Sequence, residues 1–494
     1  MTDAQGGGPS VAPSFSRAGR GHAIVVGGSM AGLLAARVLA AHFDRVTLVE
    51  RDTFPDAPEF RKGVPQSRHV HVLLGRGQQL MERFFPGLLA ELAAAGAPTI
   101  MWPTEMLWLM PAGWSKRFTP GTPFVSMSRE LLEWCVRRRL AASPRLAFLP
   151  AHDVVGLVAS PDGTAITGVE LRARGGSADG LAPTQRLAAD LVVDASGRGS
   201  HTPRWLEALG YEPPAETRIN SFLAYASRYY APPGGFQADW KGLFFNAKPP
   251  SIPRGGALFP VEGERWLVTL AGIGGDAPPL DEAGYLAFAR RLRSPIMYEV
   301  IRRARPLSPI VGYRRTENQL RHYERLRRWP ERLLVSGDAV CAFNPIYGQG
   351  MTVAAVDALA LHRCLRAQER RQPDGDLTGL ARRFQQAVAE SSATPWLMAT
   401  GEDLRYPTTE GARPGVVTRL LHRYLDRVNL AATDNVTVNR AFGQVLNLLA
   451  PPSTLFRPNV LLPALLAARD GHDDGVPPTT TPFPDQPALE VVSA

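Results

Sequence analysis

The chain has 494 residues, 45% of them hydrophobic and 20% charged, which is enough to build two or more lobes around substantial cores. Its net charge of +9 comes from 51 arginines and only four lysines, and the arginines are spread along the chain, often beside acids, which argues against a nucleic-acid-binding face. Three cysteines without paired spacing argue against a disulfide framework or a structural zinc site. The lack of an apolar run of 18 residues predicts that the chain has no transmembrane helix, and the composition agrees with a large cytoplasmic protein.

The chain is predicted to begin with a disordered leader, residues 1–20, which has scattered Gly, Pro and Ser and no apolar signal core. From His22 to Asp52 the pattern is a buried strand, a glycine-rich turn, an apolar helix face and a second strand that ends at Glu50. This order is typical of a βαβ unit that binds a dinucleotide. The alternative is a glycine-rich turn without a ligand.

The turn itself is predicted to receive the pyrophosphate of that dinucleotide. Gly27 permits the tight turn, and Gly32 permits close packing of the helix on the strand. Ser29 stands where the usual fingerprint has its middle glycine, and its small side chain still leaves room for the pyrophosphate. Glu50 is placed to accept hydrogen bonds from ribose hydroxyls. The predicted contacts of the turn are Gly27, Gly28, Ser29, Met30, Ala31 and Gly32.

A loop with several basic residues follows the second strand. Arg51, Arg61 and Lys62 are predicted to flank the cofactor, although solvated loop charges are an equal alternative. His69 and His71 would share one face of a strand. No third ligand has supporting spacing, so no metal site is predicted.

The next segment contains a helix start and a β-meander. Ser128 and Arg129 open a predicted helix, and Arg129 is either a cofactor contact or a solvated residue at the helix N-terminus. Residues 148–195 contain three β-rich runs separated by turn signals, which predict a meander. The last run ends in Asp194-Ala195-Ser196-Gly197, and Ser196 is predicted to lie at the cofactor.

Aromatic residues are frequent in the strands of the region that follows. Strands are predicted from Asn220 to Tyr230 and from Arg265 to Ala271, in a sheet that covers one face of the cofactor. Each aromatic residue is alternatively plain core. The residues predicted to line a large apolar substrate pocket are Phe222, Tyr225, Phe245, Phe259 and Trp266.

The segment from Gly337 to Met351 is the most informative stretch of the chain. It follows a short buried strand, and its Pro- and Gly-rich loop leads into a predicted helix over residues 351–365. Asp338 can accept a hydrogen bond from a ribityl or ribose hydroxyl, and the loop amides can face the negative charge of a reduced flavin. The alternative is a plain strand-to-helix turn. The predicted cofactor contacts are Gly337, Asp338, Pro345, Gly348, Gln349, Gly350 and Met351.

The C-terminal part of the sequence is predominantly helical in pattern. Apolar residues recur at spacings of three and four between Leu420 and Val428, which predicts an amphipathic helix within a helical region over residues 371–470. The Pro-rich tail, residues 471–494, is predicted to be disordered.

The two dinucleotide motifs, about 300 residues apart, together resemble the FAD-dependent monooxygenases of the para-hydroxybenzoate hydroxylase fold. The resemblance implies that the N-terminal unit holds the ADP half of FAD and that Gly337-Asp338 holds the ribityl chain. It also implies that the following loop lies beside the isoalloxazine and that Arg129 lies against the phosphates or the ribityl chain. Many aromatic hydroxylases have Gly-Ala-Asp-Gly where this chain has Asp194-Ala195-Ser196-Gly197. The run in this chain is similar to that of flavin halogenases and some flavin epoxidases or reductases.

A closer resemblance is to the flavin epoxidases of bacterial polyether antibiotic biosynthesis, those acting on monensin- and lasalocid-type polyenes. The segments that carry it are Glu50-Arg51-Asp52, residues 61–71, 194–200 and 259–263, and Phe343 to Gly348.

These motifs define an expected α/β architecture of three parts. They are a Rossmann-like FAD-binding lobe built from separated segments, a β-sheet substrate lobe and a C-terminal helical region. The expected ranges are 21–85, 125–205 and 325–370 for the first, 86–124 and 206–324 for the second, and 371–470 for the third.

The expected activity is that of an FAD-dependent monooxygenase, which inserts one oxygen atom from O2 into a hydrophobic small molecule. Epoxidation of a C=C bond of a polyketide or terpenoid is the expected reaction, with NAD(P)H as electron donor, used directly or through a flavin reductase. No base stands out in the second lobe and no residue is assigned as catalytic, which favours an alkene over a phenol, because a phenol gains from deprotonation. The alternatives are an aromatic hydroxylase, a flavin halogenase, although no Trp-x-Trp-x-Ile-Pro segment occurs, and a non-catalytic flavin-binding protein.

Overall fold

The first lobe is built on a five-stranded parallel sheet. The structure is a computed structural model, and it describes residues 21–175, 182–467, 477–478 and 480–482. All four strand pairs are parallel, and the strands are short apolar runs, as expected for a sheet buried on both faces. The order across the sheet is β21 (Leu333–Val335), β12 (Leu191–Asp194), β1 (His22–Val26), β2 (Arg45–Val49) and β8 (Leu146–Leu149). The sheet therefore combines strands from both halves of the chain.

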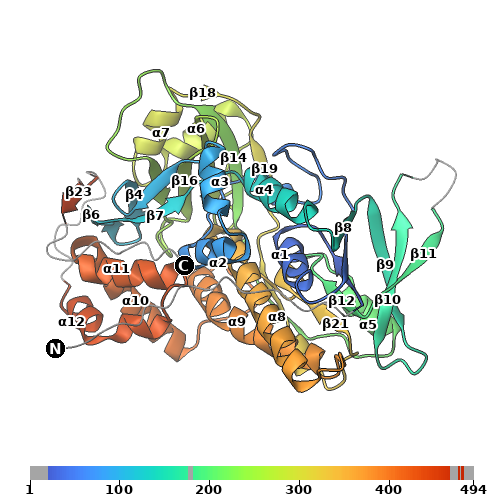
Figure 1. Cartoon of the computed structure of the whole chain (residues 1–494). Coiled ribbons are helices and arrows are strands. Elements are labelled where there is room, and N and C mark those ends of the chain that lie inside the picture. The colour runs from blue at the N-terminus through green and yellow to red at the C-terminus, as the bar shows by residue number, and fades with distance from the viewer. Residues whose placement is uncertain (1–20, 176–181, 468–476, 479, 483–494) are drawn as a thin grey trace, which may run out of the picture.

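Helices from distant parts of the sequence cover this sheet. Figure 1 shows α1, α2 and α8 close together, and their buried residues belong to the same apolar core as the strands. The main helices are α1 (Met30–Leu39), α2 (Gly75–Phe84), α3 (Leu88–Ala94), α4 (Arg129–Ala141), α8 (Gly350–Arg371) and α9 (Leu380–Asp403). A small helix, α5 (Thr202–Ala208), follows β12. The predicted meander is confirmed as three antiparallel strands, β9 (His152–Ala159), β10 (Ile166–Ala173) and β11 (Thr184–Ala188).

The second lobe is an eight-stranded sheet in which two strands come from early in the chain. β4 (Met106–Met110) pairs in parallel with β15 (Gly242–Phe245), while the neighbouring strands are antiparallel. The other strands are β5 (Gly113–Trp114), β14 (Ala224–Ala231), β16 (Arg254–Val261), β17 (Arg265–Gly272), β18 (Arg305–Pro306) and β19 (Val311–Tyr313). Two helices, α6 (Glu282–Arg290) and α7 (Ile296–Ile301), supply side chains to the core on one face of this sheet.

The first long strand of this lobe starts later than its sequence pattern predicts. β14 begins at Ala224 rather than at Asn220, because Phe222 has a left-handed backbone with φ of +53° that interrupts an extended run. The residues before it turn away, and Asn220 forms an isolated bridge with Glu410.

Small sheets and several 3₁₀ turns connect the lobes. One sheet joins β13 (Glu216–Ile219), β20 (Asn318–Arg321) and β22 (Cys341–Ala342), and another pairs β3 (Thr99–Trp102) with β7 (Thr122–Val125). The 3₁₀ turns are η1 (Pro65–Arg68), η2 (Tyr323–Arg325), η3 (Gly337–Ala339), η4 (Pro345–Tyr347) and η5 (Pro452–Phe456). β22 thus fixes the chain between the Gly337-Asp338 motif and its loop.

The predicted C-terminal helical region is present, and its helices pack on two different lobes. α9 packs on α8 and contributes to the core of the first lobe. The later helices form a separate core with Trp108 and Met110 of β4, and they are α10 (Val416–Asp434), α11 (Val436–Leu446) and α12 (Pro458–Leu466). Among the described residues, no helix is both long enough and apolar enough to span a membrane.

The prediction of a disordered tail is wrong for one short segment. β23 (Thr480–Pro482) pairs in parallel with β6 (Arg117–Thr119), where it can use backbone groups at a free strand edge. The predicted leader, residues 1–20, and the remainder of the tail apart from residues 477 and 478 lie outside the described residues.

Candidate active site

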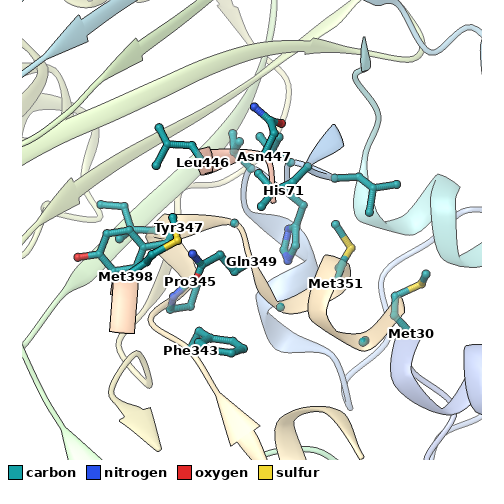
Figure 2. Close-up of a pocket in the computed structure, with 18 of the residues that line it drawn as sticks. Met30, His71, Phe343, Pro345, Tyr347, Gln349, Met351, Met398, Leu446 and Asn447 are labelled. Atoms are coloured by element: carbon teal, nitrogen blue, oxygen red, sulfur yellow. The ribbon is translucent and has the colours of Figure 1, made fainter. Parts of the chain in front are cut away.

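A large cavity of about 2380 Å³ lies where the two lobes and the C-terminal helices meet. Its wall includes the glycine-rich turn, the loop after Gly337-Asp338, the cavity-facing side of the second sheet and parts of α10 and α11. Figure 2 shows one region of it, with Met30 and Met351 close to the loop that carries Pro345 and Gln349. The dinucleotide motifs and the predicted substrate lobe therefore face a shared space.

The glycine-rich turn is closed by backbone geometry and by Glu50. Gly27 has φ of +99°, and a Cβ atom on Gly32 would lie 1.8 Å from the Gly27 carbonyl oxygen, so both positions require glycine. Glu50 accepts a hydrogen bond from the Gly28 amide at 2.7 Å and another from the Asp52 amide at 3.0 Å. Glu50 thus holds the turn, and it also lines the cavity where a ribose is predicted.

Arg129 presents a free guanidinium nitrogen at this turn. Ser128 caps α4 by accepting a hydrogen bond from the Leu131 amide, which places Arg129 in the first turn of the helix. Its Nη2 donates to Ser29 Oγ at 3.1 Å and pairs with Glu133 at 2.9 Å. Its Nη1 is buried and has no hydrogen-bond partner among the described residues. A buried guanidinium nitrogen that lacks a hydrogen-bond partner, beside a helix N-terminus, is suited to a phosphate.

Arg61 lines the same cavity, but its guanidinium is already used by the protein. Nε pairs with Glu133 at 2.6 Å, Nη1 with Glu50 at 3.2 Å and Asp52 at 3.3 Å, and Nη2 donates to the Gly28 carbonyl at 2.9 Å. Its role in this arrangement is to brace the turn from behind.

The other two basic residues predicted at this loop differ in position. Arg51 lines the cavity. Lys62 is exposed and lies outside the wall, because the chain turns outward there, so its predicted contact is corrected to a solvated loop charge.

The Gly337-Asp338 motif meets the glycine-rich unit through a close contact. Gly337 has φ of +62°, and a Cβ atom there would lie 2.5 Å from the Ala31 Cβ atom, so only glycine lets β21 and α1 approach in this way. The Gly337 amide donates to Asp357 of α8 at 3.1 Å. Asp338 lines the cavity and accepts no hydrogen bond from the described residues. Burial raises the pKa of its carboxyl group, against the opposing attraction of Arg198.

A buried network holds the loop from Asn344 to Tyr347. Asp403, at the end of α9, accepts hydrogen bonds from Asn344 Nδ2 at 3.0 Å, from the Tyr347 hydroxyl at 2.7 Å and from Asn318 Nδ2 at 2.6 Å. Burial raises the pKa of Asp403 to about 6, although these donors oppose the shift. The loop is thus fixed from behind by a carboxyl group from the C-terminal helical region.

The loop then leads into α8 along the cavity wall. Pro345, Gly348, Gln349, Gly350 and Met351 all line the cavity, as predicted for residues beside a cofactor. Gly348 has φ of +64°, and the Gln349 Oε1 atom is buried without a hydrogen-bond partner among the described residues. The amides at the start of α8 therefore face the cavity with the positive end of the helix dipole.

Ser196 also lies in the wall, in a loop held by Asp194. The Asp194 carboxylate accepts hydrogen bonds from the Ser196 amide at 2.9 Å and from the Thr202 and Ser200 hydroxyls. Gly197 has φ of +83°, and a Cβ atom added there would meet no atom within 4 Å, so its conformation and not its space demands glycine.

Three of the five predicted pocket residues line the cavity. They are Tyr225, Phe245 and Phe259. Trp266 does not, because alternate residues of a strand face opposite sides of a sheet: Thr269 and Ala271 of β17 face the cavity, whereas Trp266 joins the core formed with α6 and α7. Phe222 is 39% exposed in the turn before β14 and also lies outside the wall. Both predictions are therefore wrong.

Two histidines in the wall are held as neutral rings. His69 lies beside Tyr225, with ring centres 4.5 Å apart, and its Nδ1 is 2.7 Å from Ser227 Oγ. His71 Nδ1 donates to the His69 carbonyl at 2.9 Å, and Figure 2 shows its ring directed towards the loop carrying Gln349 and Met351. Burial lowers the pKa of His69 to about 3 and of His71 to about 4. The predicted strand through them is absent, and they follow η1 in an irregular segment.

Comparison with known proteins identifies the family. The family described as "FAD binding domain" matches residues 21–391, three quarters of the chain. The chain belongs to this FAD-binding domain family. Protein Rv3254 of Mycobacterium tuberculosis is 34% identical over 397 residues, which cover 78% of this chain and 80% of that protein.

Solved structures show the same fold at low sequence identity. A flavoprotein/dehydrogenase from Cytophaga hutchinsonii is 15% identical with a TM-score of 0.63, covering 90% of this chain and 98% of that one. PqsL, a probable FAD-dependent monooxygenase from Pseudomonas aeruginosa, is 20% identical with a TM-score of 0.54, covering 85% and 99%. The flavin-dependent brominase Bmp2 is 13% identical with a TM-score of 0.59, covering 92% and 96%.

The residues of the cavity fit the cofactor of the FAD-binding domain family. The unpaired Nη1 atom of Arg129 suits a phosphate, and the Asp338 carboxylate, which lacks a donor among the described residues, suits a sugar or ribityl hydroxyl. The first residues of α1 and of α8 supply two helix N-termini to the same cavity. FAD binding by this family member is therefore consistent with its own side chains.

Sequence reasoning missed several residues that line the cavity or support its wall. Glu133 orients both Arg61 and Arg129. The one sequence feature that indicates this role is its position four residues after Arg129 on the predicted helix. Asp403 left none, because its partner Asn344 lies 59 residues away. The walls supplied by the C-terminal helices were also missed, and they include Leu421, Leu425, Phe442, Leu446 and Asn447.

Proposed function

We propose that the protein is an FAD-dependent monooxygenase that transfers one oxygen atom from O2 to a hydrophobic organic substrate, by epoxidation of a C=C bond. One observation carries this proposal. The cavity runs without interruption from the glycine-rich turn to a chamber walled by aromatic residues of the second sheet and by apolar residues of α10 and α11. A dinucleotide alone needs no such chamber.

The protein's part in this reaction is to bind, orient and exclude water. Arg129, Glu50 and Asp338 would hold the ADP half and the ribityl chain. When bound, FAD supplies the redox chemistry and the activation of oxygen. The amides at the start of α8 would stabilise negative charge at the edge of the flavin ring, and the apolar chamber would keep water from the reacting atoms.

The proton chemistry of the chamber supports an alkene as the substrate. Oxygen transfer to a C=C bond needs no base acting on the substrate, whereas a phenol gains from deprotonation. The two histidines in the wall have pKa values lowered to about 3 and about 4 by burial, so they are weak bases at neutral pH. The resemblance of several segments to polyether epoxidases supports a polyketide or terpenoid of natural-product biosynthesis, including antibiotic biosynthesis, as the substrate class.

NAD(P)H is the proposed source of electrons, either by direct reduction or through a flavin reductase, in a cytoplasmic setting. Arg51, Pro345 and Ser196 belong to the proposed cofactor contacts together with the residues of the two glycine motifs.

Two other activities have specific support. An aromatic hydroxylase shares the proposed cofactor site, and a halogenase is favoured by the structural similarity to brominase Bmp2 and by the Asp-Ala-Ser-Gly run at Asp194. A halogenase requires halide for product formation, so assays with and without bromide identify it. A hydroxylase accepts phenols in preference to polyenes, so a panel containing both substrate classes identifies that activity.

The test is product analysis under ¹⁸O-labelled oxygen gas. The purified protein is expected to be yellow with non-covalent FAD, and a polyene product is expected to gain one labelled oxygen atom. A product without label refutes the monooxygenase assignment. Failure to take up FAD would refute the proposed cofactor site, and FAD uptake without any substrate-dependent oxygen consumption would select a flavin-binding protein without catalysis.

A further inference from the structure

Exposed apolar side chains are concentrated on the C-terminal helices. Of the twelve large hydrophobic residues exposed in the described parts of the chain, nine lie between residues 397 and 466. We refer to them as the apolar rim, and they are Leu397, Val416, Val417, Leu420, Leu449, Phe456, Leu462, Leu465 and Leu466. Monomeric proteins rarely expose so many apolar residues together unless the surface binds something.

The elements that carry the apolar rim are packed on one another. α10 contacts both α11 and α12, and α11 contacts η5. The rings of Tyr424 and Phe456 stack with centres 4.8 Å apart, which joins α10 to η5. Arg427 of α10 donates to the carbonyl oxygen of Leu465 at 2.6 Å, which joins α10 to the end of α12. Apart from Leu397, which lies on α9, the rim is therefore carried by one helical unit.

The cavity opens at the apolar rim. Leu397, Val417, Leu449 and Phe456 are exposed to solvent and also line the cavity, so they stand at its mouth. Behind them the wall continues with Leu421, Leu425 and Phe442, and then with Trp108 and Phe244 of the second sheet. A series of apolar side chains thus leads from the rim into the chamber, beside polar wall residues such as His422 and Asn429.

The charge of the same region is positive. Residues 413–467 contain six arginines, no lysine and two acidic residues, which leaves a net charge of +4. One of the acids, Asp426, already pairs with Arg405. Arg419, Arg423 and Arg457 are exposed on the rim's own elements. An apolar surface with exposed arginines is complementary to an anionic lipid headgroup layer with acyl chains beneath it.

We propose that the apolar rim docks on the surface of an anionic lipid bilayer, with the mouth of the cavity facing the lipid. The described helices lie on that surface and do not cross it. The docked geometry lets a long apolar substrate move from the lipid into the chamber. This entry of substrate rests on the proposed monooxygenase function. Docking itself does not depend on turnover, so its failure and the failure of the proposed function are distinguishable.

The test is co-sedimentation of the oxidised, FAD-loaded full chain with vesicles. We expect binding to vesicles of phosphatidylglycerol and phosphatidylcholine in equal parts, at least tenfold weaker binding to phosphatidylcholine alone, and loss of affinity as salt is raised. The double variant Leu420→Asp/Leu465→Asp is expected to lower the affinity at least tenfold. Neither side chain lines the cavity.

A matched control comes from the second lobe. Leu280 is 56% exposed, as Leu420 is, and Leu307 is 38% exposed, and both lie away from the rim and the cavity. Leu280→Asp/Leu307→Asp is expected to bind vesicles as the parent does. Circular dichroism and FAD content show whether each variant is folded. If the rim variant fails to fold, Arg419→Glu/Arg423→Glu serves instead and is expected to remove the preference for anionic vesicles.

Three outcomes would overturn the proposal. The parent chain does not bind anionic vesicles, as would happen if segments outside the described residues cover the rim. The rim variant binds as well as the parent. Sedimentation velocity shows a dimer that the rim variant dissociates, which would make a second copy of the chain the occupant of the rim.

Discussion

Two aspartates at the ends of neighbouring parallel strands offer a direct test of the proposed FAD site. Asp194 ends β12 and accepts three hydrogen bonds from its own loop, whereas Asp338 follows β21 and accepts none from the described residues. The pKa of Asp338 is raised because burial disfavours its charge more than Arg198 favours it. Asp338→Asn removes this charge while keeping the shape, so we expect the apoprotein to be at least as stable as the parent.

The affinity for FAD should fall in the same variant, although the stability of the apoprotein does not. If Asp338 accepts a hydrogen bond from an FAD hydroxyl, exchanging the charged acceptor for the neutral amide oxygen of Asn costs about 1–1.5 kcal/mol. That corresponds to a roughly 5- to 13-fold weaker Kd. Asp194→Asn is the control: it turns an NH2 group towards donors, so the apoprotein should lose about 1–3 kcal/mol of stability.

Two assays decide between these expectations. Quenching of flavin fluorescence on titration of the apoprotein gives the FAD affinity, and thermal unfolding followed by circular dichroism gives the stability. The reasoning about Asp338 is refuted if Asp338→Asn binds FAD as tightly as the parent. It is also refuted if that variant loses as much stability as Asp194→Asn, since Asp338 would then be a structural residue like its neighbour.

Three further predictions concern the same lobe. Arg129→Met should weaken FAD binding at least tenfold, because it removes the unpaired Nη1 atom. Arg61→Met should instead lower stability by about 3–5 kcal/mol, because three carboxylates lose their buried partner. If the two variants had equal effects in FAD titration and in unfolding, the separate roles assigned to Arg129 and Arg61 would be contradicted. Gly337→Val should abolish FAD uptake, since its Cβ would lie 2.5 Å from Ala31, whereas Gly234→Ala, which meets no atom within 4 Å and lies outside the cavity wall, should take up FAD normally in the same assay. Burial raises the pKa of Asp403 from 3.8 to about 6, so the parent should lose about 2 kcal/mol of stability as the pH rises from 4 to 6; Asp403→Asn should lack this part of the slope in unfolding at a series of pH values, and an unchanged slope would count against it.

The parts of the site that could be predicted are those whose signals are local in the sequence. The strand, turn, helix and strand from His22 to Val49 depend on periodicity and on glycines within 30 residues, and so does the helix that Ser128 caps. The Gly337-Asp338 motif was recognisable because it lies at a strand end. Its contact with Ala31 was not predicted, because no local pattern in the sequence signals it.

The parts that could not be predicted depend on three-dimensional placement. Tyr225 and Trp266 are aromatic residues of adjacent strands, and the sequence does not say which face of the sheet meets the cavity. Asp403 belongs to a helix whose sequence pattern does not distinguish it from other helices. Its role arises because the folded chain places it behind Asn344. Pairing of Thr480 with Arg117 similarly joins segments more than 350 residues apart.

The arrangement of the five-stranded sheet sets the order in which the chain can fold. Among the described strands β21 pairs only with β12, and β12 lies between β21 and β1, so the sheet is incomplete until residue 335 has been synthesised. At roughly 5–20 residues per second, the interval after β1 emerges lasts roughly 15–60 s. Once β12 has emerged, and until β21 follows, the edge of β12 offers unpaired backbone groups to other chains. The nascent protein is therefore vulnerable to aggregation at this edge until Gly337-Asp338 can close on α1.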